Sequence, residues 1–272
     1  MTSVAAALAA ARAKLPANEA RLLLGHVLRQ PAAWLIAHAE VVLDEAALLG
    51  FASLVARRAG GEPVAYLVGR REFFGREFAV SPAVLIPRPE TELLVDIALA
   101  TGATSILDLG TGSGCIAVTL ALEIPRAQVT AVDVSATALG VARNNAERHG
   151  ATLRLLQSDW FAELLGECFE LIVANPPYIA AADPHLAAGD LRHEPPAALA
   201  SGAEGLDAIR HIIAAAPAHL APGGQLWLEH GYDQAAAVYK LLTAAGLTDI
   251  RQHRDLAGIV RVSGGRRKST QT

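Results

Sequence analysis

The residues with the clearest chemical meaning are Asn175-Pro176-Pro177-Tyr178, which directly follow the apolar run Leu171 to Ala174. A planar amide or aromatic amine nitrogen is a poor nucleophile, because its lone pair is delocalised into the neighbouring π-system. The Asn175 side-chain oxygen and a backbone carbonyl of the proline segment can accept its two N–H bonds and help the nitrogen to pyramidalise. The prolines stiffen the segment, and Tyr178 offers a ring face on which a flat target can stack. The motif therefore indicates a site that directs such a nitrogen at an electrophile.

A second chemical pattern is the glycine-rich run Gly110-Thr111-Gly112-Ser113-Gly114, between Leu107-Asp108-Leu109 and a predicted helix from Cys115 to Leu122. Glycine lets the backbone turn sharply and lets a ligand lie against main-chain N–H groups. Such a turn serves dinucleotides as well as S-adenosylmethionine, and in some proteins it serves only close packing. The run therefore predicts a nucleotide-like ligand without naming it.

Two further side chains of ligand-binding type follow predicted strands at the same edge of the sheet. Asp133 lies nineteen residues after Gly114, where a carboxylate can accept hydrogen bonds from both ribose hydroxyls. Trp160 can cover one face of an adenine, and Asp159 can accept from its amino group. A lone tryptophan is usually a packing residue, and a plain turn would explain the prolines. Their joint position favours S-adenosylmethionine, whose sulfonium methyl would be the electrophile, with no metal required.

These residues need a parallel sheet to bring them together, and the chain beyond residue 100 alternates short apolar runs with helical stretches, as in α/β folds. The predicted strands are Ile106-Leu107, Val129 to Val134, Leu153 to Leu156, Leu171 to Ala174, Gln225 to Leu228, Thr248 to His253 and Ile259 to Ser263. Only a tight turn can join the last two, so we expect that pair to be antiparallel. The prediction is an α/β fold with a seven-stranded, mostly parallel sheet.

The start of the chain predicts a small helical bundle. From Val4 to about Arg58 apolar residues recur at helical spacing, and Asp44 is placed to cap one helix. Residues 73–80 are typical of a short hairpin, and Pro89 suits the first turn of a further helix. We therefore expect a helical bundle over residues 1–70, a hairpin and connector over 71–86, and the α/β domain over 87–272.

Composition limits the class of protein. The 272 residues are 52% apolar and 18% charged, which supplies a buried core and argues against global disorder. The formal net charge of −4 argues against a dedicated nucleic-acid binder, although Arg266-Arg267-Lys268 could form a local basic patch or a solvated tail. No apolar stretch is long enough to cross a bilayer. The two cysteines, Cys115 and Cys168, suit a reducing cytoplasm and are expected in the core. We expect a soluble, cytoplasmic monomer.

Together these segments resemble the release factor glutamine N5-methyltransferases, the PrmC or HemK family. The resemblance covers nearly the whole α/β domain and the connector, and more weakly the helical start. Besides Gly110 to Gly114 and Asn175 to Tyr178, the similar segments are Pro63 to Leu67, Glu72 to Gly75, Leu85 to Glu92, Glu194 to Pro196, Gly205 to Asp207 and Gly264 to Arg266.

The resemblance implies a Rossmann-like class I methyltransferase sheet preceded by a helical domain that recognises the substrate. It implies S-adenosylmethionine as methyl donor and, as substrate, the glutamine of the Gly-Gly-Gln motif in peptide chain release factors. The implied cofactor contacts are Gly110, Thr111, Gly112, Ser113, Gly114, Asp133, Trp160 and Asn175. The residues implied to receive the glutamine are Asn175, Pro176, Pro177 and Tyr178. The connector around Arg88 to Thr91 is expected to line the site.

Three other functions share part of this pattern. A DNA or RNA amino-methyltransferase would present adenine N6 or cytosine N4 to the same motif, but such enzymes usually carry a basic reading segment, and the loop from Ile179 to Ala203 holds one arginine and several acids. A nicotinamide oxidoreductase would share the glycine turn and Asp133 but would leave the Asn175 motif unexplained. A non-catalytic translation adaptor would leave that motif idle. No histidine is assigned as a base, because the nitrogen can lose its proton after the methyl arrives.

Overall fold

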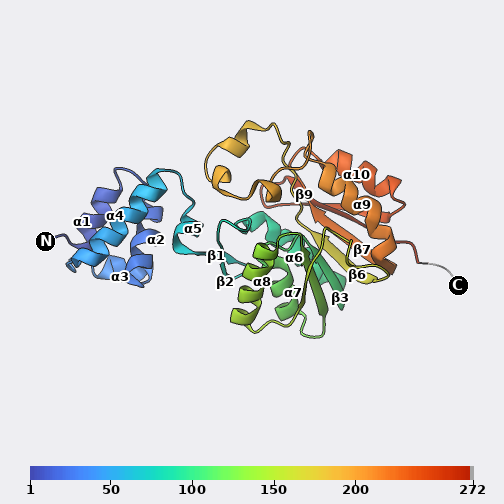
Figure 1. Cartoon of the computed structure of the whole chain (residues 1–272), viewed down its shortest axis with the longest axis horizontal. Helices are drawn as coiled ribbons and strands as arrows, with labels where there is room; N and C mark the ends of the chain where they lie inside the picture. The colour runs from blue at the N-terminus through green and yellow to red at the C-terminus, as the bar shows by residue number, and fades with distance from the viewer. Residues whose placement is uncertain (270–272) are drawn as a thin grey trace. The chain divides into compact units, whose positions relative to one another are not determined.

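The computed structural model describes residues 1–269 and divides into two compact units (Figure 1). The first unit comprises Met1–Arg70 together with Gly189–His193, and the second comprises Arg71–Ala188 and the described residues from Glu194 onward. The assignment of residues 189–193 to the first unit differs from the expected continuous α/β domain. Within that unit, Asp190 accepts a hydrogen bond from Arg58 at 2.7 Å. Because these two residues are far apart in the sequence, the spacing of apolar residues could not predict this contact.

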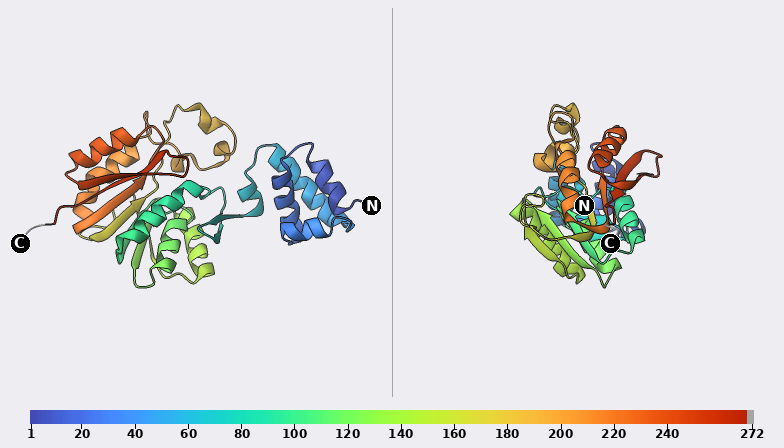
Figure 2. Two further views of the ribbon diagram at one scale, coloured as in Figure 1. Left: turned by 180° about the vertical axis from the view of Figure 1, so that it is seen from behind. Right: turned by 90° about the vertical axis from the view of Figure 1, so that its right-hand side faces the viewer.

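The first unit consists mainly of helices (Figures 1 and 2), and their buried apolar residues form one core. Its helices are α1 (Val4–Ala11), α2 (Ala17–Leu28), α3 (Ala32–Ala37), α4 (Glu45–Ala59) and α5 (Val64–Val68). Leu23 and Leu24 of α2 are fully buried against Leu35 and Phe51. The Asp44 carboxylate accepts from the Ala47 N–H at 2.7 Å, which confirms the predicted helix cap.

A two-stranded hairpin, β1 (Arg70–Phe73) and β2 (Arg76–Ala79), follows the bundle. Phe74 and Gly75 have φ values of 50° and 69°, as a two-residue hairpin turn requires. The predicted hairpin is confirmed, although it begins earlier than expected. Its second strand is fastened to the α/β unit, because the Asn145 side chain exchanges hydrogen bonds of 2.7 and 3.0 Å with the Ala79 backbone.

The sheet of the second unit has seven strands in the order β5-β4-β3-β6-β7-β9-β8. Its strands are β3 (Ser105–Leu109), β4 (Gln128–Asp133), β5 (Arg154–Gln157), β6 (Phe169–Ala174), β7 (Leu220–Glu229), β8 (Thr248–Arg254) and β9 (Val260–Arg266). Strand β9 is antiparallel to both β7 and β8, whereas β5, β4, β3, β6 and β7 are parallel neighbours. The predicted sheet and its antiparallel last pair are confirmed.

Helices cover both faces of this sheet (Figure 1). They are α6 (Glu92–Thr101), α7 (Cys115–Glu123), α8 (Ala136–His149), α9 (Asp207–His219) and α10 (Ala235–Ala244), and a 3-10 turn over Pro89–Thr91 leads into α6 as expected from Pro89. Successive strand residues alternate between two cores: Leu171 packs in the core that includes α6 and α7 residues, and Ile172 in the core that includes α9 and α10 residues. The central strands are therefore buried on both faces.

Strand order reverses between β3 and β6, and this switch point is where ligands bind in open α/β sheets. The loop after β6 adds 3-10 turns at Pro184–Ala187, Leu191–His193 and Pro196–Ala198. Cys115 is buried, but Cys168 is exposed just before β6, so the expectation of a core position was wrong for Cys168. No helix within residues 1–269 is long and apolar enough to cross a membrane.

Candidate active site

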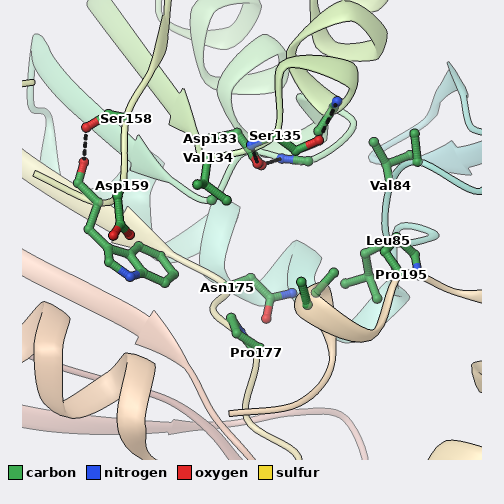
Figure 3. A pocket seen from close by; sticks show the side chains of 17 residues that line it. Val84, Leu85, Asp133, Val134, Ser135, Ser158, Asp159, Asn175, Pro177 and Pro195 are labelled. Atoms are coloured by element: carbon green, nitrogen blue, oxygen red, sulfur yellow. Dashed lines mark hydrogen bonds between the residues drawn. The ribbon is translucent and has the colours of Figure 1, made fainter. Parts of the chain in front are cut away.

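A cavity of about 330 Å³ opens at the carboxyl edge of the parallel strands (Figure 3). This volume lies within the range of about 300–1,000 Å³ common for small-molecule sites. Figure 3 shows Asp133, Val134 and Ser135 facing Asn175 and Pro177 across it. The wall is completed by Ala83, Val84, Leu85, Gly110, Gly112, Ala138, Ser158, Asp159, Trp160, Pro195, Ala197 and Ala198. All of these residues belong to the second unit.

The glycine turn after β3 contributes its backbone rather than its side chains to this cavity. Gly110 and Gly112 line the cavity with φ values of 72° and 55°, in the left-handed region that favours glycine. Thr111 is buried and donates to Asp108 Oδ2 at 2.6 Å, and Ser113 is buried with its carbonyl bound by Asn145. Thr111, Ser113 and Gly114 therefore do not line the cavity. Gly114 instead allows α7 to pack closely against α8, because a Cβ at this position would lie 3.1 Å from Ala142 Cβ.

The buried Asp108 supports this turn from below. Burial raises the pKa of its carboxyl to about 7, and the hydrogen bond from Thr111 offsets only part of that rise. Its Oδ1 is buried without a hydrogen-bond partner within residues 1–269. The carboxyl is therefore protonated more easily than an exposed aspartate, and it binds Thr111 within the glycine turn.

Asp133, the last residue of β4, both lines the cavity and organises it. Its Oδ2 accepts from the Gly112 N–H at 2.9 Å, and its Oδ1 accepts from the Ser135 N–H at 2.9 Å. Each carboxylate oxygen has a further lone pair, so ribose hydroxyls can still be accepted. The contact with Gly112 was not predicted, because it joins the ends of two neighbouring strands.

Trp160 reaches the cavity wall through an unusual backbone conformation. Its φ is 51°, which is uncommon for a bulky residue. The Ser158 hydroxyl donates to the Trp160 carbonyl at 2.9 Å and accepts from the Glu163 N–H at 3.1 Å, which holds this turn. A Cβ on Gly110 would lie 3.5 Å from the indole ring, so the glycine turn and the indole form one continuous surface.

Asn175 follows β6 and has a partner on only one end of its amide. Its Nδ2 donates to Thr91 Oγ1 at 3.0 Å. Its Oδ1 accepts no hydrogen bond from the described chain, and Asn175 lines the cavity. The amide thus presents an acceptor to the cavity, as the sequence motif indicated.

The rest of the motif shapes the segment around Asn175. Pro177 lines the cavity, whereas Pro176 is buried and Tyr178 lies outside the wall. The Tyr178 ring packs on the core beneath α9 and α10, and its hydroxyl donates to Glu229 Oε1 at 3.1 Å. The structure therefore corrects the expectation that Tyr178 offers a free stacking face, because burial of an aromatic ring with a bonded hydroxyl is the more favourable arrangement.

The backbone after the prolines is held in place by Gln234 and Gly205. Gln234 Nε2 donates to the Tyr178 carbonyl at 3.0 Å. A Cβ at Gly205 would lie 2.2 Å from that same carbonyl oxygen, so only glycine fits there. These two contacts fix the position of the Tyr178 carbonyl and thus of the backbone that follows the prolines.

Glu229 lies at the end of β7 and had no signal in the sequence. It is 1% exposed, and its Oε2 accepts from the Thr91 hydroxyl at 2.7 Å while Oε1 accepts from Tyr178. Burial raises the pKa of Glu229, against the effect of these two hydrogen bonds and of Arg261. In the sequence, Glu229 was only the residue that follows the predicted strand Gln225 to Leu228, and no role was predicted for it.

A second buried carboxylate, Glu194, joins the two loops that complete the cavity wall. Its side chain has no exposed surface and accepts from the Ile86 N–H at 3.0 Å and from the Arg88 guanidinium. The connector residues Val84 and Leu85 and the loop residue Pro195 lie beside these bonds. The sequence had marked Glu194 only as part of a similar segment. The stretch from Arg88 to Thr91 was expected to line the site, but the connector residues in the wall are Ala83, Val84 and Leu85.

Comparison with known proteins agrees with this geometry. Residues 1–69 match the PrmC N-terminal domain, and residues 89–205 match the methyltransferase small domain. The chain is 56% identical over 263 residues to the release factor glutamine methyltransferase of Burkholderia pseudomallei, covering 93% of this chain and 92% of the relative. It is 51% identical to that of Xylella fastidiosa strain Temecula1, covering 98% of both chains. The chain belongs to the release factor glutamine methyltransferase family.

Membership of this family confirms the predicted family, fold class and enzyme class. A methyltransferase from Pyrococcus furiosus has a similar structure, with a TM-score of 0.57 and 20% identity over 78% of this chain and 97% of that chain. At this identity the likeness concerns the fold alone. The cavity of this protein lies at the carboxyl ends of β3, β4 and β6 of the class I methyltransferase sheet.

Proposed function

We propose that this protein methylates the side-chain amide nitrogen of the glutamine in the Gly-Gly-Gln motif of peptide chain release factors, with S-adenosylmethionine as methyl donor. The observation that carries the proposal is the Asn175 amide, which offers an unpaired Oδ1 to the cavity while its Nδ2 is bonded to Thr91. An acceptor held in this way suits a substrate that arrives with N–H donors.

The residues opposite Asn175 fit the proposed cofactor. Gly110 and Gly112 leave room for a ligand to lie against the main chain, Asp133 can accept from ribose hydroxyls, and the Trp160 indole can cover adenine. When bound, S-adenosylmethionine supplies an electrophilic sulfonium methyl. The fit rests on the donors and acceptors in the wall and on the cavity of about 330 Å³.

Asn175 would act by orienting the substrate nitrogen. Its Oδ1 and a backbone carbonyl of residues 175–177 accept the two amide N–H bonds, which fixes the plane of the amide and favours pyramidalisation of the nitrogen. No side chain has to remove a proton beforehand, because the nitrogen becomes acidic once it carries the methyl group. Pro177 and the buried Pro176 keep the segment rigid during this step.

The helical bundle of residues 1–70 would recognise the release factor. This role is supported by the match of residues 1–69 to the PrmC N-terminal domain and by the names of the relatives. We infer that the enzyme acts as a monomer on a protein substrate, without direct contact to nucleic acid. The formal net charge of −4 supports a protein rather than a polyanionic substrate.

The direct test measures transfer of a labelled methyl group from S-adenosylmethionine to purified release factor. Parallel acceptors are a release factor with Gln→Ala in the Gly-Gly-Gln motif and duplex DNA. Label on the intact release factor alone supports the proposal. Label on DNA would instead favour an amino-methyltransferase acting on bases, and absence of label on all acceptors would refute the proposed activity.

The matched enzyme variant is Asn175→Ala. It should bind S-adenosylmethionine with nearly unchanged affinity, measured by calorimetry, yet lose about 10²–10³-fold in kcat, as is common when one preorganised polar contact at the reacting centre is removed. Unchanged methylation by Asn175→Ala would contradict the role of this amide.

A further inference from the structure

Two hydrogen bonds in series connect Asn175 to Thr91 and Thr91 to the buried Glu229. Asn175 Nδ2 lies 3.0 Å from Thr91 Oγ1, and Thr91 Oγ1 lies 2.7 Å from Glu229 Oε2. Thr91 is 2% exposed and Glu229 is 1% exposed, so water does not replace either partner. Thr91 ends the 3-10 turn before α6, and Glu229 ends β7, so Asn175 is bonded to one of these elements and that element to the other.

The number of protons in these two hydrogen bonds permits only one orientation of the Asn175 amide. An ionised Glu229 only accepts, so the single hydroxyl proton of Thr91 must point to it. Thr91 Oγ1 then has only lone pairs to offer Asn175, and it can pair with the amide nitrogen but not with the amide oxygen. A flipped amide would set two acceptors against each other in a site that water does not reach.

We propose that Thr91 and Glu229 are positioning residues that lock the Asn175 amide with its oxygen toward the substrate nitrogen. The inference rests on the proposed function, since it assigns these residues a part in that reaction. Tyr178 contributes from the other side, because its hydroxyl donates to Glu229 Oε1 at 3.1 Å and thereby leaves Oε2 for Thr91.

The orientation requires Glu229 to be ionised, and its pKa is raised chiefly by burial. The neighbouring Glu90 adds to the rise. The hydrogen bonds from Thr91 and Tyr178 and the charge of Arg261 act in the opposite direction. The carboxylate thus receives one donor on each oxygen and a nearby positive charge.

The test compares Thr91→Val with Thr91→Ser and with a control, Thr119→Val. Valine keeps the shape of threonine but removes the hydroxyl, so the amide can flip, whereas serine keeps the hydroxyl. Thr119 is also fully buried, on α7, and its hydroxyl has no hydrogen-bond partner within residues 1–269. Thr119→Val therefore controls for the loss of a buried threonine hydroxyl.

For Thr91→Val we expect kcat for release factor methylation to fall about 10- to 100-fold, because a misplaced contact at the reacting centre has effects of this order. The KM for release factor and the affinity for S-adenosylmethionine should stay close to those of Thr119→Val, whereas the Tm should fall, because the buried Glu229 loses a hydrogen-bond donor. Thr91→Ser should restore most of the rate. If Thr91→Val were to misfold, Thr91→Ala would test the same loss of the hydroxyl in a smaller side chain.

Two results would overturn the inference while leaving the proposed function intact. One is a Thr91→Val enzyme as active as Thr119→Val, and the other is a Thr91→Val defect that Thr91→Ser does not restore. Absence of methyl transfer by the unmodified protein would overturn the proposed function itself, and the inference with it.

Discussion

Asn175 and Asp133 each follow a parallel strand, but the protein uses their oxygens differently. Both carboxylate oxygens of Asp133 already accept backbone N–H groups, from Gly112 and Ser135. The Asn175 oxygen accepts nothing from the described chain. Asp133 therefore builds the cavity as well as lining it, whereas the Asn175 oxygen is the acceptor that the proposed function assigns to the substrate.

Replacing Asp133 by alanine should weaken binding of S-adenosylmethionine by about 1–3 kcal/mol, the usual effect of removing a hydrogen-bonding charge. The variant loses the expected ribose acceptor and also the tie to the Gly112 N–H. Calorimetry with the purified variant measures the change. Unaltered affinity would show that the carboxylate does not bind the cofactor.

The pH dependence of kcat should reflect the ionisation of the Glu229 carboxyl. Only its ionised form accepts both hydroxyl protons, and burial raises its pKa above the usual value of about 4.3. Activity is then present above that raised pKa and lost as the pH falls through it. Profiles of kcat against pH should show this acid limb in the unmodified enzyme and not in Thr91→Val. The same limb in both would contradict the role of Glu229.

The stability of the fold should change in the opposite direction over this pH range. A carboxyl whose pKa is raised on folding contributes most below its unfolded pKa, and that contribution is lost as the pH rises through the folded pKa. For Glu229 the acid loss of turnover should therefore occur without unfolding, which circular dichroism at the same pH values can check.

At the scale of elements, the cavity depends on loops that two buried contacts hold together. The connector before α6 and the loop after β6 both contribute apolar wall residues, and Glu194 binds both the Ile86 N–H and Arg88. Neither loop has strand partners along most of its length. The Glu194 carboxylate therefore holds these two loops together, as backbone hydrogen bonds hold neighbouring strands together.

Glu194→Gln should destabilise the protein by about 1–3 kcal/mol, because its amide nitrogen cannot accept from either donor and leaves a buried group unpaired. It should also speed release of S-adenosylmethionine. The matched control is Glu204→Gln, which breaks an exposed pair with Arg210 and should change stability by about 0–1 kcal/mol. Urea unfolding and stopped-flow release measure both, and equal effects in the two variants would contradict this account of the loops.

At the scale of the whole molecule, the two units have separate apolar cores. The core of the bundle is made of residues from Val4 to Leu67, and the two cores of the α/β unit contain only residues from Phe73 onward. Every residue of the cavity wall belongs to the second unit. Cofactor binding and release-factor recognition can therefore reside in different units.

Deletion of residues 1–69 should leave the affinity for S-adenosylmethionine nearly unchanged but abolish most methylation of intact release factor, because the proposed recognition domain is lost. Calorimetry and labelled methyl transfer give the two readouts, with the full-length chain as control. Undiminished methylation of release factor by the shortened protein would refute the recognition role of the bundle.

Local features of the fold could be predicted from the sequence because neighbouring residues decide them. Alternation of apolar runs predicted the seven strands, and the few residues between the last two predicted their antiparallel pairing. Asp44 and Pro89 marked helix starts through contacts within one turn. Strand ends were less exact: β7 begins at Leu220, ahead of the predicted Gln225, because pairing with a neighbouring strand extends it.

Contacts between distant residues were decided only by the tertiary structure. The chemical motif of Asn175 was evident in the sequence, but the bond from Thr91 to Glu229 joins residues 138 positions apart, and that from Arg88 to Glu194 joins residues 106 apart. The burial of Tyr178 likewise depends on Glu229 and on helices that follow it in the chain. Motif and periodicity determine which residues can react, whereas packing decides which atoms of those residues are left free to do so.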